Sequence, residues 1–73
     1  MNGNNDNYTN FVLEEIKIIK ALNAQYWKEL KDAKAGTGMC SMLPENDREA
    51  IAKTLEKHIS DNEKSIQEML NSL

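Results

Sequence analysis

The sequence has little of what stabilises most very small domains. It contains one cysteine, Cys40, so no disulfide can form within the chain. One cysteine and one histidine, His58, are too few for a Cys/His metal site, so neither a metal nor a cofactor is expected. A chain of 73 residues buries only about 60% of its unfolded surface. Self-association or a partner is therefore the expected source of additional stability.

Long apolar runs and an excess of basic residues are also absent. No uninterrupted apolar stretch is long enough for a transmembrane helix, so no membrane association is expected. The Asn-rich segment 1–10 lacks the apolar core of a signal peptide. The net charge of −3 argues against nucleic-acid binding, which needs a basic surface. The expected location is the cytoplasm, where a lone thiol stays reduced.

Glycine and proline are few, and they divide the chain. Residues 1–8 are expected to form a disordered polar leader, and residues 9–73 a single domain. A first helix is predicted from the Thr9–Asn10 region, which supplies capping side chains, to about Ala35. Gly36 is a suitable C-terminal stop for that helix.

A second helix is predicted to begin near Pro44–Asn46 and to run to about Leu70. Asn46 and Glu49 have the spacing of a capping box at its start. The segment between the two helices holds the remaining glycines, and no alternation long enough for a strand occurs. The fold class is therefore all-α.

Both predicted helices carry apolar residues at alternating spacings of three and four, the heptad pattern of packed helices. We call these positions the seam. In the first helix the seam is Val12, Ile16, Ile19, Asn23, Tyr26, Leu30 and Ala33. In the second helix it is Ala52, Leu55, Ile59, Asn62, Ile66, Met69 and Leu73. One asparagine interrupts each seam.

Folding the chain into an antiparallel hairpin brings the two asparagines to the same height. Asn23 and Asn62 have residue numbers that add to 85, as do Leu30 with Leu55 and every other seam pair. A buried amide without a partner costs about 1–3 kcal/mol, and pairing removes that cost. We therefore predict an antiparallel two-helix hairpin with an Asn23–Asn62 layer. Pairing of each asparagine with its counterpart in another chain is the alternative.

Apolar residues outside the seam predict an interface. Phe11, Ile18 and Leu22 form a second stripe on the first helix, with Trp27 near its edge. The second predicted helix packs against the seam and so cannot cover this stripe as well. A large exposed apolar patch typically marks an interaction site. The simplest arrangement is two hairpins packed as a four-helix bundle. Met39 and Met42, with the neighbouring Leu43, are expected to cover its open end or to contact a partner.

The few residues with catalytic or ligand-binding chemistry are scattered. Cys40 and His58 lack the partners that a thiol-dependent catalyst needs, so an enzyme is not expected. Arg48, the only arginine, can grip a phosphate or carboxylate with its planar guanidinium. Gly36 and Gly38 can offer backbone N–H groups to an anion, and Tyr26 is a further candidate contact.

The segment Pro44-Glu45-Asn46-Asp47-Arg48, followed by Leu55 and Ile66, resembles a segment of the phage anti-CBASS sponge family, which is related to Thoeris anti-defence sponges. Members of that family are small helical oligomers that sequester cyclic nucleotides without cleaving them. The resemblance implies a phosphate contact for Arg48.

The sequence thus predicts a small non-enzymatic helical protein that self-associates and binds a partner protein. Such a chain suits a phage-type inhibitor of a host defence system or a small regulator. The alternative is a sponge that sequesters a cyclic nucleotide through Arg48 and the Gly36–Gly38 loop.

Overall fold

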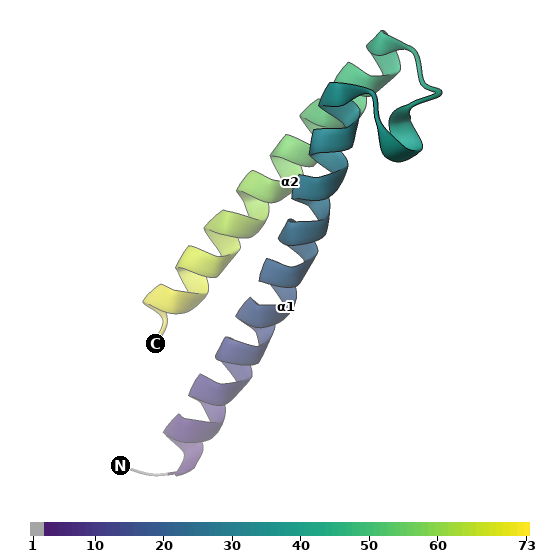
Figure 1. Ribbon diagram of the computed structural model, residues 1–73. Helices are drawn as coiled ribbons and strands as arrows, with labels where there is room; N and C mark the ends of the chain where they lie inside the picture. The colour runs from purple at the N-terminus through teal and green to yellow at the C-terminus, as the bar shows by residue number, and fades with distance from the viewer. Residues whose placement is uncertain (1–2) are drawn as a thin grey trace.

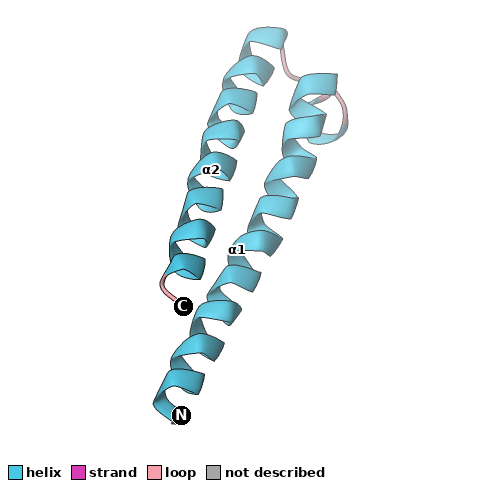
Figure 2. Cartoon of the chain, turned by 90° about the vertical axis from the view of Figure 1, so that its left-hand side faces the viewer, coloured by secondary structure: helices cyan, strands magenta, loops and turns pink. Residues whose placement is uncertain are grey.

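The computed structural model describes residues 3–73, and the side chains from residue 7 onward. Two long helices, α1 (Gly3–Ala35) and α2 (Glu45–Asn71), are joined by a loop that contains the short 3-10 helix η1 (Gly38–Cys40). The helices are antiparallel and lie side by side, with the loop at one end and both termini at the other (Figures 1 and 2). No strand occurs within residues 3–73. The predicted all-α helical hairpin is confirmed.

The first helix begins earlier than the sequence predicts. Its first residue is Gly3, so residues 3–8 of the expected leader are helical, while residues 1–2 lie outside the described part. No proline and no further glycine occurs before Gly36, so nothing in this segment breaks the helix. The hydroxyl groups of Tyr8 and Ser72, 3.1 Å apart, form a hydrogen bond that links this part of α1 to the end of α2.

The end of α1 and the start of α2, which meet the loop, are capped in different ways. α1 ends at Ala35, and Gly36 adopts a positive φ of 69°, the left-handed conformation that glycine tolerates best. The Gly36 N–H donates to the Asp32 carbonyl at 2.8 Å and so closes the helix. At the start of α2 the capping-box prediction is wrong: Pro44 occupies the cap position without a side-chain hydrogen bond, and Asn46 lies inside the first turn.

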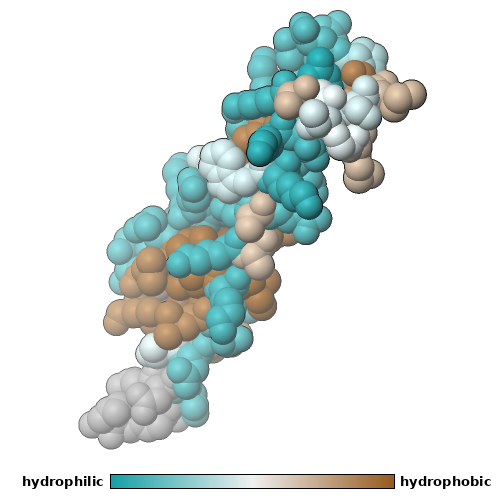
Figure 3. Space-filling view, in the orientation of Figure 1, coloured by the Kyte–Doolittle hydropathy of each residue, from teal (hydrophilic) through white to brown (hydrophobic). Residues whose placement is uncertain are grey.

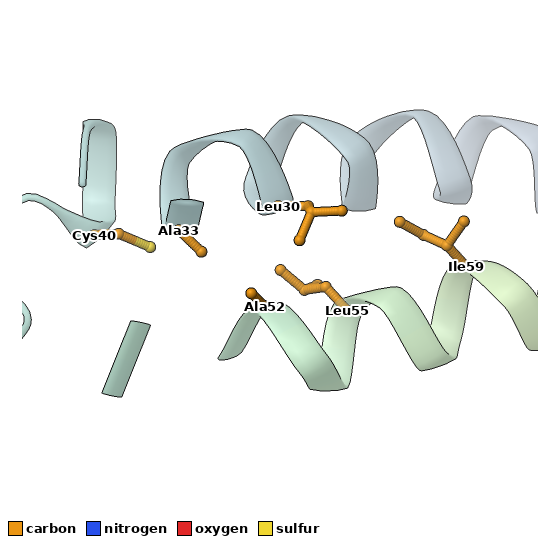
Figure 4. Close-up of a cluster of buried hydrophobic side chains, with 6 residues drawn as sticks. All are labelled: Leu30, Ala33, Cys40, Ala52, Leu55 and Ile59. Atoms are coloured by element: carbon orange, nitrogen blue, oxygen red, sulfur yellow. The ribbon is translucent and has the colours of Figure 1, made fainter. Parts of the chain in front are cut away.

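The seam forms two apolar clusters along the hairpin. The cluster near the loop combines Leu30, Ala33, Cys40, Ala52, Leu55 and Ile59 (Figure 4). The cluster near the termini combines Val12, Ile16 and Ile66, with Ile19 and Met69 packed against it. Leu73, the predicted partner of Val12, lies beyond the end of α2 and is exposed, so the last seam layer is not closed.

An asparagine pair lies between these two clusters. Asn62 Nδ2 donates to Asn23 Oδ1 at 2.8 Å, within one chain. Asn23 is buried, and its own Nδ2 donates to the Ile59 carbonyl at 3.3 Å. The pair occupies the layer that the shared residue-number sum of 85 predicts. Both amides therefore find partners without help from a second chain.

The hairpin is a single layer of helices with two broad faces. Its dimensions are 56 × 17 × 11 Å and its radius of gyration is 16.5 Å, whereas a compact domain of this length would have a radius of about 11 Å. Each helix is covered by its neighbour on one side only. Within the described residues, neither helix has a segment apolar and long enough to cross a bilayer.

Replacing one asparagine of the pair should destabilise the hairpin more than replacing both. Asn62→Leu leaves the buried Asn23 oxygen without its donor, so the free energy of unfolding should fall by about 1–3 kcal/mol. The double variant Asn23→Leu/Asn62→Leu should regain most of that loss, because no polar atom is left unpaired. Urea unfolding measures the difference, with Ser60→Ala, on the exposed side of α2, as the control. Equal stability of the single variant and the wild type would contradict the pairing.

Candidate functional site

Arg48, the strongest ligand-binding candidate of the sequence, lies against the end of α1. Its Nη1 donates to the Ala33 carbonyl at 3.2 Å and to the Lys34 carbonyl at 3.5 Å. These carbonyls belong to the last turn of α1, where no later N–H group of the helix is available to donate to them. A cation there also suits the negative end of the helix dipole. Arg48 thus ties the start of α2 to the end of α1.

The surroundings of Arg48 are mixed in charge. A hollow of about 340 Å³ beside it is lined by Lys34 and Arg48 together with Glu45 and Glu49. Gly36 lies so close that an added Cβ would stand 2.9 Å from Arg48 Nη1. The structure therefore brings Arg48 and Gly36 together, but against helix carbonyls and near two carboxylates.

The other predicted ligand contacts lie elsewhere. Gly38 packs against the carboxylate of Asp32, and an added Cβ would stand 2.5 Å from its oxygen. Tyr26 stacks on His58, with the ring centroids 5.6 Å apart. These two rings line a separate hollow with Ile51 and Thr54. Tyr26, Gly38 and Arg48 therefore do not form one pocket.

The loop is closed by a different side chain from those predicted. Met39 and Met42 are 96% and 90% exposed, so within the single hairpin neither covers the loop end. Cys40 fills that place: it is buried in the loop-end cluster and points toward Ala33 (Figure 4). The geometry of η1 decides this, because a one-turn helix can turn only part of its surface toward the core.

The predicted interface residues are exposed but do not share one stripe. Trp27 follows Ile18 by nine positions, so at about 100° per residue the two lie on opposite sides of α1. The structure agrees, since the hollow of about 600 Å³ that Trp27 lines with Lys20 and Glu63 includes neither Ile18 nor Phe11. The prediction that Trp27 lies at the edge of the Ile18 stripe is wrong.

Each broad face carries its own exposed apolar residues. We call one the Ile18 face; it contains Phe11, Ile18, Leu22, Ile51 and His58. We call the other the Trp27 face; it contains Leu13, Lys20, Trp27, Glu63 and Leu70.

The apolar side chains on these faces are large and exposed to solvent. Phe11 is 63% exposed, Ile18 61% and Trp27 54%. Apolar side chains reach the surface in the half of the hairpin near the termini (Figure 3). Exposed apolar patches of this kind typically mark binding surfaces.

Sequence reasoning missed the two-faced arrangement, although the signal was present. Residues seven apart return to the same side of a helix, so Leu13, Lys20, Trp27 and Lys34 form one row. The role of Arg48 had no comparable signal, because the register of α2 against α1 decides which carbonyls it reaches.

Comparisons with protein families, curated proteins and solved structures find no match for this chain.

Removing the guanidinium should weaken the joint between the helices. Arg48→Ala leaves the carbonyls of Ala33 and Lys34 without a donor from α2, so the free energy of unfolding should fall by about 1 kcal/mol. Arg48→Lys should recover part of this, because an ammonium on a shorter side chain can also donate to these carbonyls. Chemical denaturation measures the loss, with Lys53→Ala on the same helix as the control. No loss in Arg48→Ala would rule out the joint.

Proposed function

We propose that the chain is a non-enzymatic helical interaction protein, which binds protein partners, another copy of itself among them, through its two broad faces. The observation that carries this proposal is the single-layer hairpin, 11 Å in its shortest dimension, with apolar residues exposed on both sides. Covering such residues on association removes apolar surface from water. A protein that works in this way occupies the surface of its target, as an inhibitor or a small regulator does.

The anchors of such a surface are identifiable. Tryptophan is enriched among the residues that dominate binding energy, and Trp27 lies beside a hollow of about 600 Å³ at the centre of its face. On the opposite face, Phe11, Ile18 and Leu22 form an apolar row along α1. None of the four is part of either core cluster, so their exposure serves no folding purpose within the single hairpin.

Cyclic-nucleotide sequestration is the weaker candidate. Arg48 already donates to helix carbonyls, and the adjoining hollow holds two glutamates that would repel a phosphate. Tyr26 lines a different hollow from Arg48, so the two do not form one pocket for a nucleotide. The geometry therefore favours protein binding over the sponge.

Self-association should depend on both faces. Ile18→Ser and Trp27→Ala each remove an exposed apolar anchor and should each weaken self-association by about 1–2 kcal/mol, roughly a tenfold rise in Kd. Sedimentation velocity over a concentration series measures this. Ala21→Ser, at an exposed position away from α2, is the matched control. A wild-type chain that remains monomeric at millimolar concentration would contradict self-association.

Cyclic nucleotides should not stabilise the chain. Thermal unfolding in the presence of cyclic dinucleotides and trinucleotides, at a thousandfold excess over protein, should show no shift in Tm. A shift that Arg48→Ala abolishes would instead support the sponge. A shift that survives in that variant would indicate binding elsewhere.

A further inference from the structure

The Ile18 face is acidic. Positions seven residues apart along each helix return to this face, and they hold the acidic residues Glu15, Glu29, Asp32, Asp47, Asp61 and Glu68. No lysine or arginine occupies these positions among the residues whose side chains the structure describes. Lys57, on the outer side of α2, forms an ion pair with Asp61 at 3.0 Å.

The Trp27 face has the opposite character along α1. Its lysines are Lys17, Lys20, Lys31 and Lys34, and they flank the apolar Leu13, Ala24 and Trp27. One of them, Lys34, forms an ion pair with Glu56 of α2 at 3.1 Å. This side of α1 is therefore a basic amphipathic surface around Trp27. The α2 positions of the same face add Glu49, Glu56 and Glu63 together with Lys53, so the face as a whole carries five lysines against three glutamates.

We infer that the Ile18 face of one copy binds the Trp27 face of a second copy. The inference rests on the proposed self-association and specifies its geometry. Apolar anchors on both faces supply the attraction. The charges favour this pairing, because it brings the carboxylates of the Ile18 face to the lysines of the Trp27 face, and they penalise the pairing of two Ile18 faces. The chain thus carries both halves of one interface on opposite sides.

One symmetric alternative, in which two Ile18 faces meet, brings acidic residues of both copies together without lysines between them. Like charges at an interface cost affinity. Each broad face measures about 56 × 17 Å, which is large enough for the roughly 800 Å² per partner of a standard interface.

An interface between unlike faces has a consequence for assembly. Each bound copy still presents one free face of each kind, so association continues until a ring closes or an open stack grows. The pairing also depends on ionic strength, because its charges lie at the surface. The four-helix bundle with two equivalent hairpins is a different, self-limiting arrangement.

Two single-face variants test the inference. Ile18→Lys places a cation in the acidic face, and Trp27→Glu places an anion among the α1 lysines of the Trp27 face. Both side chains are more than half exposed, so neither change disturbs the core. Lys31→Glu serves as a second Trp27-face variant should Trp27→Glu fail to fold. Ala21→Lys, at an exposed position away from both faces, is the control.

The decisive measurement is sedimentation velocity of each variant alone and of an equimolar mixture. Each variant alone should sediment as a monomer of about 8.3 kDa. The mixture should give a species of twice that mass and no larger. The intact Trp27 face of Ile18→Lys can bind the intact Ile18 face of Trp27→Glu, and the other face of each variant is disrupted. The wild type and Ala21→Lys should form larger species, which shrink as the salt rises from about 50 to about 500 mM.

Three outcomes would overturn the inference in different ways. A mixture that stays monomeric while the wild type assembles would exclude the pairing of unlike faces but leave self-association standing. Assembly of Trp27→Glu alone, with Ile18→Lys monomeric, would show symmetric pairing through the Ile18 face. A monomeric wild type would exclude self-association as well. The occupant of the acidic face would then be a basic helix of another protein.

Discussion

Each helix of the hairpin can bury only one stripe against its neighbour, and the surfaces of the molecule depend on this limit. The heptad seam uses the a and d positions of both helices, and a layer of two helices has nothing to cover the rest. The result is a slab with a radius of gyration of 16.5 Å. Its stability within one chain comes from two small clusters, which are separated by a polar layer.

The polar layer gives the seam its register. A shift of one helix against the other by a turn would leave Asn23 and Asn62 opposite apolar side chains, each with an unsatisfied amide. The pair therefore costs some apolar contact but disfavours other alignments, as buried asparagines do in coiled coils. The same register carries Arg48 to the carbonyls of Ala33 and Lys34. The Asn pair near the middle and the Arg48 joint at the loop end thus act on the same alignment.

Much of the fold was predictable because helix pairing repeats a simple spacing. The two helices, the stop at Gly36 and the Asn23–Asn62 layer all follow from periodicity and from the sum of residue numbers. The start of α1 was not predictable, because the Asn-rich segment neither requires a helix nor prevents one. The loop was not predictable either: which of Met39, Cys40 and Met42 turns inward depends on the path of η1.

The candidate site was predicted less well, because the packing of the two helices decides which exposed side chains share a face. Phe11, Ile18, Leu22 and Trp27 were correctly expected outside the seam, but treating them as one stripe ignored the half turn between Ile18 and Trp27. Arg48 was singled out for its chemistry, yet its hydrogen bonds go to the chain itself. The distribution of charge between the two faces appears only when both helices are aligned.

Small-angle X-ray scattering over a dilution series is the most direct test of the proposal that another copy covers the faces of this thin hairpin. At the lowest concentrations the radius of gyration should approach the 16.5 Å of a single hairpin. The scattering mass should then rise above one chain as the concentration increases. A radius near the 11 Å or so of a compact domain would contradict the thin hairpin, and a mass of one chain at every concentration would contradict self-association.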